Sequence, residues 1–376
     1  MNLLDSLKKK TKAMLDSLET IVNTESPSKD LEAVRTCADE LAKLGSAILG
    51  AEPERLGDEK RHLRWRFGDA PAVLILGHFD TVWPKGTVDR WPFSNDGDKA
   101  TGPGIFDMKA GLIQGLFALG SLGDLSGIEI LFNSDEEIGS ESSIGFIEES
   151  ARRASAVLVL EPSEGGSLKL ARKGVASYVL RVEGRAAHSG LEPERGINAV
   201  VELAHQILEI SRIGRQEVGT TVTPTVASAG TTSNTVPAAA RVAVDVRAKT
   251  VVELERVDKE MGDLSPRVEG AKLVLERKPP RLPFEREMSS ELFEKARDIA
   301  KDLGLPDLDG VEVGGGSDGN ITAALGVPTL DGLGAVGKGA HAEGEHISIS
   351  SMPQRAALVA ALVDRLRSEF SSGTTR

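Results

Sequence analysis

The sequence has 376 residues, which favours two domains, and 40% of them are hydrophobic, enough for buried cores. Its net charge of −12 argues against a nucleic-acid partner or an anionic membrane surface. The single cysteine, Cys37, excludes an intrachain disulfide, and no apolar run approaches the ~20 residues that span a bilayer.

The N-terminal segment predicts two helices. Apolar residues recur at helical spacing from Leu3 to Ile21, and a second helix is expected from an N-cap at Ser28 to Gly45. The first apolar residues precede the lysines at positions 8–10, whereas a secretory signal has the reverse order. We therefore expect a cytoplasmic protein.

Three short apolar runs then indicate a buried sheet. They cover residues 72–76, 128–132 and 157–160, and helical patterns at 109–122 and 141–153 lie between them. Nearly continuous apolar strands that alternate with helices are typical of a largely parallel sheet with both faces covered. In such sheets the ligand site lies beyond the carboxyl ends of the strands.

The pattern changes near Gly174 and predicts a second domain. Strands are expected at 175–182, 221–227, 238–246 and 272–275, and helices at 196–210 and 251–264. This order, strand-helix-strand-strand-helix-strand, is that of a ferredoxin-like α+β unit. After a proline-rich exit at 278–283, helices at 287–303 and 351–369 and a strand at 327–330 return to the first pattern. We predict an α/β domain formed by 1–173 and 282–376, with 174–281 inserted.

Five segments carry potential metal ligands. Each is weak evidence alone, because a His or an acidic residue after an apolar run is usually an ordinary loop residue. Together they supply two histidines, one aspartate and two glutamates, a mixture that suits a zinc hydrolase with a position left open for water. The candidates are His78, Asp107, Glu137, Glu161 and His341.

The motifs that contain these residues resemble a known family. The segments are His78-Phe79-Asp80-Thr81-Val82, Gly102-Pro103-Gly104, Asp135-Glu136-Glu137, Ala187-His188-Ser189-Gly190 and Gly314-Gly315-Gly316-Ser317-Asp318. Over essentially its whole length the chain resembles the di-zinc exopeptidases and deacylases. These include carboxypeptidase G, which it resembles most, acetylornithine deacetylase, aminoacylase and succinyl-diaminopimelate desuccinylase. The resemblance implies a zinc-peptidase-like catalytic domain, an inserted dimerisation domain and amide hydrolysis.

The resemblance also implies roles for individual residues. Asp107 would bridge two zinc ions, with His78 and Glu161 completing one site and Glu137 and His341 the other. Asp80 would orient His78, and Glu136 would be the general acid–base. His346 is the alternative to His341, with Glu343 and Glu345 as nearby carboxylates. The peptide bond between Asp107 and Met108 is expected to be cis.

The inserted domain is expected to contribute substrate contacts. The resemblance implies that His188 reaches the active site of a partner subunit and steadies the oxyanion there. It implies that Asn234 and Arg247 bind the substrate carboxylate, for which the planar fork of arginine is well suited. Gly315 matches a further substrate-binding position. The role of His188 requires a homodimer, which we expect.

One departure from the family concerns substrate preference. Carboxypeptidase G has a lysine for the glutamate side chain, and the nearest match here is Ser167, with Lys169, Arg172 or Lys173 as possible replacements. We predict a cytoplasmic carboxypeptidase or amidohydrolase with two zinc ions per subunit, which Co²⁺ or Mn²⁺ can replace. Its substrate would be a small peptide or N-acyl amino acid that ends in glutamate or another residue. The alternatives are an N-acyl amino acid deacylase and, in a different class, a non-catalytic ligand-binding protein.

Overall fold

The computed structural model describes residues 2–59, 61–69 and 71–371. The chain divides into two compact units. Unit 1 comprises Met1–Ala171, Arg286–Val313 and Ser317–Arg376, and unit 2 comprises Arg172–Glu285 and Gly314–Gly316. Unit 2 is therefore inserted into the sequence of unit 1. Within the described residues, no helix combines the length and the apolar composition needed to cross a bilayer.

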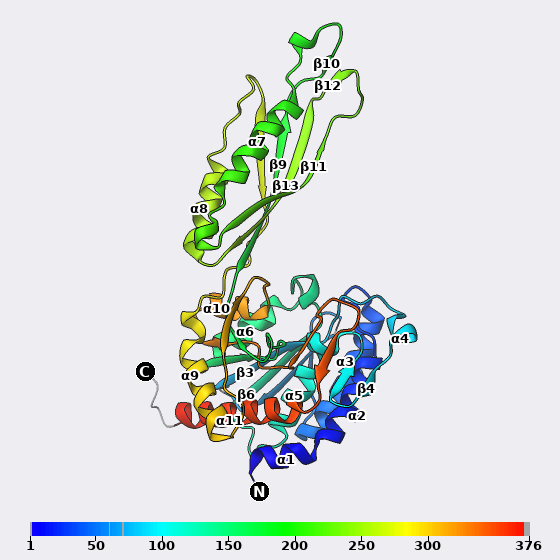
Figure 1. The fold of residues 1–376 in the computed structure, drawn as a ribbon, viewed down its shortest axis with the longest axis vertical. Helices are drawn as coiled ribbons and strands as arrows, with labels where there is room; N and C mark the ends of the chain where they lie inside the picture. Colours follow the sequence, from blue (N-terminus) through cyan, green and yellow to red (C-terminus); the bar gives the residue numbers. More distant parts are fainter. Residues whose placement is uncertain (1, 60, 70, 372–376) are drawn as a thin grey trace. The chain divides into compact units, whose positions relative to one another are not determined.

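Unit 1 is built on a mixed six-stranded sheet (Figure 1). The spatial order is β1 (Glu54–Leu56), β2 (His62–Phe67), β6 (Ile128–Asn133), β3 (Val73–His78), β7 (Ala156–Val159) and β16 (Thr329–Leu330). Strands β6, β3, β7 and β16 are parallel, whereas β1 and β2 join antiparallel at one edge. The parallel part was predicted, but the two edge strands were not. Strand β1 contains Glu54 and Arg55, and β2 contains Arg64 and Arg66; these charged residues obscure the apolar pattern of a strand.

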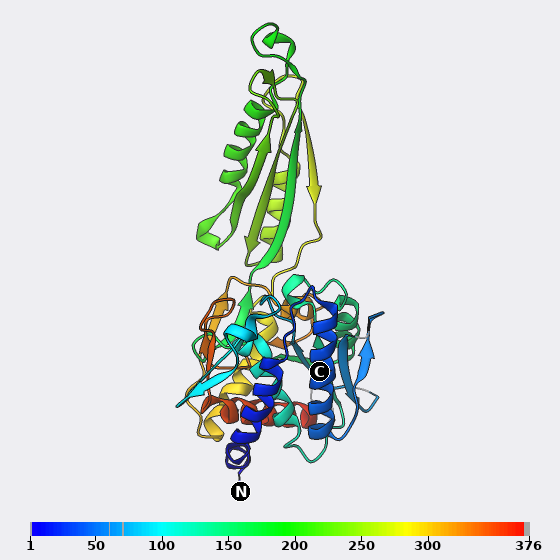
Figure 2. The same ribbon diagram turned by 90° about the vertical axis from the view of Figure 1, so that its right-hand side faces the viewer.

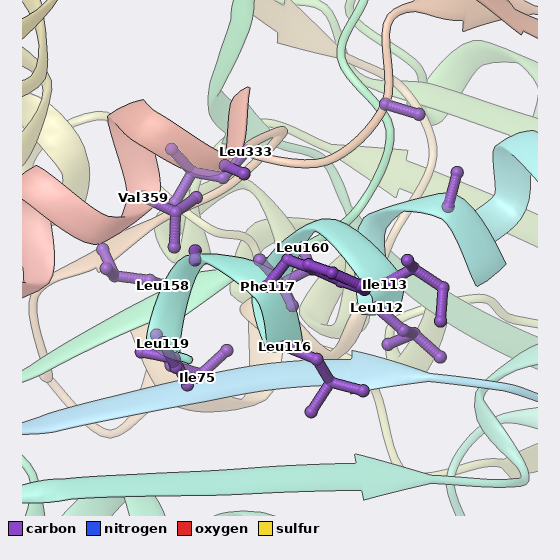
Figure 3. Packing of buried hydrophobic residues seen from close by; sticks show 14 of the residues in the cluster. Ile75, Leu112, Ile113, Leu116, Phe117, Leu119, Leu158, Leu160, Leu333 and Val359 are labelled. Atoms are coloured by element: carbon purple, nitrogen blue, oxygen red, sulfur yellow. The ribbon is translucent and has the colours of Figure 1, made fainter. Parts of the chain in front are cut away.

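Helices cover both faces of this sheet, so that the parallel strands are apolar on both sides. One face buries Ile75 and Leu158 under α5 (Ala110–Leu119) and α11 (Ser351–Ser371), as Figure 3 shows. The opposite face buries Leu74 and Val157 against α6 (Ile144–Arg153) and α10 (Asp318–Ala324). The other helices of unit 1 are α1 (Leu3–Lys9), α2 (Thr11–Asn23), α3 (Leu31–Leu49), α4 (Thr87–Arg90) and α9 (Glu287–Asp302).

Two further strand groups complete unit 1. A four-stranded sheet has the order β17 (Gly337–Lys338), β18 (His346–Ser348), β5 (Lys99–Thr101) and β4 (Ser94–Asp96). Strand β8 (Leu168–Arg172) pairs with β15 (Gly310–Val313). The sequence did not predict these strands, because none has more than five residues.

The second predicted helix begins and ends later than expected. The N-cap of α3 is Asp30, whose side chain accepts a hydrogen bond from the backbone N–H of Ala33, and not Ser28. Ser28 instead donates to Asp80. Gly45 lies inside the helix against Trp65, and the helix ends at Gly50 in a left-handed conformation.

Unit 2 has the predicted ferredoxin-like topology. Its antiparallel sheet has the order β11 (Thr221–Ala229), β13 (Ala239–Ala248), β9 (Gly174–Glu183) and β14 (Lys272–Arg277). Helices α7 (Ala199–Ile213) and α8 (Val251–Gly262) pack on one face of this sheet (Figure 2). A short ribbon, β10 (Ala187–His188) with β12 (Thr235–Val236), carries the segment around His188.

Candidate metal centre

The site lies beyond the carboxyl ends of the central strands, as the parallel sheet predicts. Strand β3 ends at His78, β7 is followed by Glu161, and β6 leads into a short helical turn, η2 (Glu136–Ile138). Asp107 lies in the turn η1 (Ile105–Lys109) before α5, and His341 lies in the loop between β17 and β18. The five candidate ligands thus come from segments far apart in the sequence.

Asp107 lies between the two candidate histidines. Its Oδ1 is 3.3 Å from Nε2 of His78, and its Oδ2 is 3.4 Å from Nε2 of His341. Each histidine also meets a second carboxylate: Oε1 of Glu161 is 3.5 Å from His78 Nε2, and Oε1 of Glu137 is 3.0 Å from His341 Nε2. The five side chains therefore form two imidazole–carboxylate groups that share Asp107.

The donor set fits a divalent metal ion. Ligand atoms of His78, Asp107 and Glu137 all lie within 4.8 Å of one another. Oδ1 of Asp107 is buried and accepts no hydrogen bond from the described residues. A buried carboxylate oxygen without a hydrogen bond is costly unless a cation compensates it. Imidazole nitrogens and carboxylate oxygens are ligands that zinc accepts.

The protonation of the cluster agrees with this interpretation. Hydrogen bonds to Asp107 and Glu137 raise the pKa of His341 to about 10. Burial lowers the pKa of His78, but the carboxylates of Asp107, Asp80 and Glu161 around its ring outweigh burial and raise that pKa well above its usual value. The carboxylates around both rings therefore favour positive charge at these nitrogens, which a metal ion bound to the neutral imidazoles would supply.

Asp80 connects His78 to the turn η2. It is fully buried, and its Oδ1 and Oδ2 accept the backbone N–H groups of Glu136 and Glu137 at 3.1 and 3.2 Å. Its carbonyl oxygen lies 3.1 Å from Nδ1 of His78, and its Oδ1 lies 3.4 Å from the same nitrogen. Ser28 adds a hydrogen bond of 2.6 Å to Oδ2. Asp80 thus fixes both the ring of His78 and the start of η2.

Three acidic residues follow β6, and they do not face the same way. The carboxylate of Asp135 accepts hydrogen bonds from the backbone N–H and hydroxyl of Ser142 and from the hydroxyl of Ser143. Burial raises the pKa of this carboxyl, but these hydrogen bonds outweigh burial and lower it overall. Asp135 therefore anchors the loop that contains Ser142 and Ser143. Glu137 lies beside His341, and Glu136, the residue before Glu137, is half-buried.

His341, and not His346, approaches the acidic cluster. The backbone of His341 adopts a positive φ of 61°, uncommon for a residue other than glycine, and its ring meets Asp107 and Glu137. Nδ1 of His346 lies instead 2.9 Å from the carbonyl oxygen of Gly344. The peptide bond between Asp107 and Met108 is cis, as expected.

Glu345 lies fully buried behind Asp107, a position that the sequence pattern did not predict. Burial raises the pKa of Glu345 to about 7, although hydrogen bonds from the backbone of Asp107, Phe106 and Gly104 and from Trp83 oppose the shift. An acidic residue in a glycine-rich loop has no periodic signal that would mark it as buried.

Of the three cations considered as replacements for the family lysine, Lys169 lies at the cluster. Its Nζ is 3.8 Å from Oε2 of Glu161. Arg172 donates to the carbonyl oxygens of Gly315 and Gly316, and Lys173 donates to that of Gly219.

The remaining candidates belong to unit 2. Nδ1 of His188 accepts a hydrogen bond from Gly190, and the carbonyl oxygen of Asn234 accepts one from Ser189. Arg247 lies on β13 and forms a two-bond ion pair with Asp245, at 3.0 and 3.2 Å. Gly315 accepts the hydrogen bond from Arg172.

Comparisons with known proteins identify a family and several relatives. The profile of "Peptidase family M20/M25/M40" matches residues 74–365. Carboxypeptidase G2 from Pseudomonas sp. is 34% identical over 375 residues, covering 93% of this chain and 88% of the relative. Succinyl-diaminopimelate desuccinylase from Thioalkalivibrio sulfidiphilus is 27% identical, covering 83% of this chain and 90% of the relative. The solved structure of the M20 family metallo-carboxypeptidase Sso-CP2 from Sulfolobus solfataricus has a TM-score of 0.71 at 17% identity. The match covers 94% of this chain and 99% of that structure.

Proposed function

Since this chain belongs to peptidase family M20/M25/M40, and is thereby a metal-dependent hydrolase, we propose that it is a two-zinc carboxypeptidase. It would hydrolyse an amide bond and release the C-terminal amino acid of a small peptide or acylated amino acid. The main support is the position of Asp107 between His78 and His341, each of which has a second carboxylate at hand. One metal ion could not contact all five side chains in a tetrahedral site.

The proposed ligand sets follow this division. His78 and Glu161 would hold one ion, Glu137 and His341 the other, and Asp107 would bridge them. A bridging carboxylate reduces the repulsion between two dications held about 3.5–4 Å apart. When bound, zinc ions would lower the pKa of a water molecule and polarise the carbonyl group of the substrate. Co²⁺ or Mn²⁺ would serve as substitutes.

Glu136 would act as general base and general acid. It is adjacent to Glu137, and Asp80 holds the backbone N–H groups of both residues, which fixes the start of the turn that carries them. Glu136 would take a proton from the attacking water and deliver it to the leaving amine nitrogen as the C–N bond breaks. Asp80 would accept a hydrogen bond from Nδ1–H of His78 and so stabilise the tautomer in which Nε2, the nitrogen facing Asp107, carries no hydrogen.

Unit 2 would bind the substrate carboxylate through Arg247, Asn234 and Gly315. Arg247 already forms a planar two-bond pair with Asp245, the geometry that it would offer to a substrate. A substrate carboxylate would exchange places with that of Asp245. His188 would donate a hydrogen bond to the oxyanion that forms on the scissile carbonyl.

A homodimer would bring His188 to the active site of the other chain. Two features of unit 2 support self-association. Strand β11 lies at the edge of its sheet and pairs only with β13 among the described residues. Helix α7 presents Val200, Val201 and Leu208 to solvent. Open strand edges and exposed apolar side chains are typical of surfaces that pair with another chain.

Lys169 would favour an acidic side chain in the released residue. Its ammonium group lies beside Glu161 and is mostly buried, so an acidic substrate group near the metal centre would be strongly attracted. The alternative is that Lys169 only neutralises Glu161. The two roles differ in their consequences, because loss of an acid-binding group affects acidic substrates alone.

A second candidate activity is deacylation of an N-acyl amino acid, which the similarity to a desuccinylase supports. The same metal centre would cleave the same kind of bond, and only the position of the recognised group would differ. A non-catalytic binding protein is the alternative from a different class.

A substrate screen tests these proposals. Zinc-loaded protein would be offered C-terminal glutamyl, aspartyl and neutral dipeptides together with N-acyl and N-succinyl amino acids, and the released amines would be quantified. We expect release of the C-terminal residue, with Lys169→Met lowering kcat/KM at least about tenfold for acidic substrates only. Lys173→Met is the matched control. No hydrolysis of any substrate class would refute the proposed enzymatic activity. An equal decrease of kcat/KM for neutral substrates would refute the role of Lys169 in specificity.

A further inference from the structure

One buried carboxylate behind the metal centre receives four hydrogen bonds. Oε1 of Glu345 accepts the backbone N–H groups of Phe106 at 2.7 Å and Asp107 at 2.9 Å. Oε2 accepts the backbone N–H of Gly104 and the indole Nε1–H of Trp83, both at 3.0 Å. Glu345 is fully buried, so these donors take the place of water.

Glu345 and its four donors link three segments that carry candidate ligands. Three of the donors lie in residues 104–107, at the start of η1, and Trp83 follows His78 by five residues. Glu345 itself lies four residues after His341 in the loop before β18. One side chain thus joins the segments of His78, Asp107 and His341.

The loop that joins His341 to Glu345 is tightly closed. The backbone N–H of Ala342 donates to Gly339, and that of Glu345 donates to Ala342, at 2.9 and 3.1 Å. Gly339 has a φ of 92°, and a Cβ there would lie 3.1 Å from Cα of Glu345. A shift of Glu345 would therefore move His341 as well.

We propose that Glu345 is a positioning residue of the metal centre. Its carboxylate sets the separation between Asp107 and His341, and so the geometry of the shared carboxylate. Both oxygens are already engaged by N–H groups, which leaves Glu345 behind the ligands rather than among them. This inference depends on the proposed metal-binding function.

The chemistry of the four donors requires an acceptor-only group. Backbone and indole N–H groups cannot accept a hydrogen bond, so every position around this side chain needs an oxygen lone pair. Glutamine would place an NH2 group against at least one N–H donor. Glu345→Gln should therefore break the link while nearly preserving the volume of the side chain.

The test measures zinc affinity of metal-free protein by competition with a chromophoric chelator. Changes to groups that support metal ligands commonly cost about 10–100-fold in affinity, and we expect Glu345→Gln to fall in that range. Glu345→Asp, which keeps the charge, should recover part of the loss. Glu343→Gln is the matched control, because Glu343 lies in the same loop but pairs with Arg90 at the surface and is 70% exposed.

A second variant protects the test against misfolding. Trp83→Phe keeps an aromatic ring and removes only one of the four donors, so we expect about a threefold to tenfold loss of zinc affinity. It decides the question if metal-free Glu345→Gln does not give a cooperative unfolding transition. Unchanged affinity in Trp83→Phe, or in folded Glu345→Gln, would overturn the positioning role.

Asp107→Asn separates this inference from the proposed function. Weaker zinc binding in Asp107→Asn with unchanged binding in folded Glu345→Gln would reject the positioning role alone. Unchanged binding in both would reject the metal centre and, with it, the inference.

Discussion

The close packing of helix α5 against the segment before Glu161 gives a prediction that can be worked from distances. A Cβ added at Gly111 would lie 2.2 Å from the carbonyl oxygen of Leu160 and 3.4 Å from Cα of Gly334. Leu160 lies directly beside α5 in Figure 3. Because the atom that is met is backbone, Gly111→Ala can be accommodated only if helix and strand separate.

The magnitude follows from two opposing effects. Replacing glycine by alanine inside a helix gains roughly 0.5–1 kcal/mol. Forcing an extra group into a packed core costs typically about 1–3 kcal/mol, and a rigid backbone contact lies at the upper end. The difference is about 2–2.5 kcal/mol, by which we expect Gly111→Ala to lower the free energy of unfolding. The substitution should also weaken zinc binding, because Glu161 follows Leu160.

Gly145 in α6 provides the matched control. It is exposed, it lies inside a helix as Gly111 does, and a Cβ there would meet nothing within 4 Å. Gly145→Ala should raise the free energy of unfolding by about 0.5–1 kcal/mol and leave zinc affinity unchanged. Urea unfolding of metal-free protein and zinc competition measure both quantities. Equal or greater stability of Gly111→Ala than of the wild type would refute the reasoning.

Three further predictions address the chemistry. Asp80→Asn should weaken zinc binding by about 10–100-fold, because an amide places an N–H group where Asp80 accepts two backbone N–H groups and steadies His78; unchanged affinity in a chelator competition would contradict this. Glu136→Ala and His188→Ala subunits, each inactive alone, should regain roughly a quarter of wild-type turnover after subunit exchange, since half the dimers are mixed and hold one complete site; no recovery despite proven exchange would exclude sharing. Burial lowers the pKa of His62 below its usual 6.5, although the negative charge of Asp135 opposes the shift. The neutral form of His62 therefore contributes stability above pH 6.5, and this contribution is lost as the pH falls through the pKa of the folded state. Between pH 7.5 and 5.5 the free energy of unfolding should decrease more for the wild type than for His62→Gln, and equal decreases would contradict this.

The sequence predicted the parts of the site that depend on regular structure. His78, Glu137 and Glu161 follow apolar runs, and the ends of buried parallel strands meet at one edge of a sheet. Asp107 and His341 lie in turns where glycine and a positive φ, rather than periodicity, determine the geometry. Their residue types marked both as candidates, but no strand placed them at this edge of the sheet, and the resemblance to a family implied their separate roles.

Other features could not be predicted because they depend on contacts distant in the sequence. Glu345 is defined by N–H groups about 240 positions earlier in the chain, which no local pattern reveals. Ser28 satisfies the rule for a helix N-cap, yet Asp30 caps α3 because Ser28 donates to Asp80. In both cases hydrogen bonds to residues of the candidate site, rather than local sequence preference, determine the position of the side chain.

The most direct test of the two-metal proposal is the number of zinc ions bound per chain during titration of metal-free protein, measured together with hydrolysis of the best substrate. We expect two ions per chain, activity that disappears on chelation and returns with zinc, and loss of both ions in Asp107→Asn. Full activity with a single bound ion, or hydrolysis that survives complete removal of metal, would contradict the proposal.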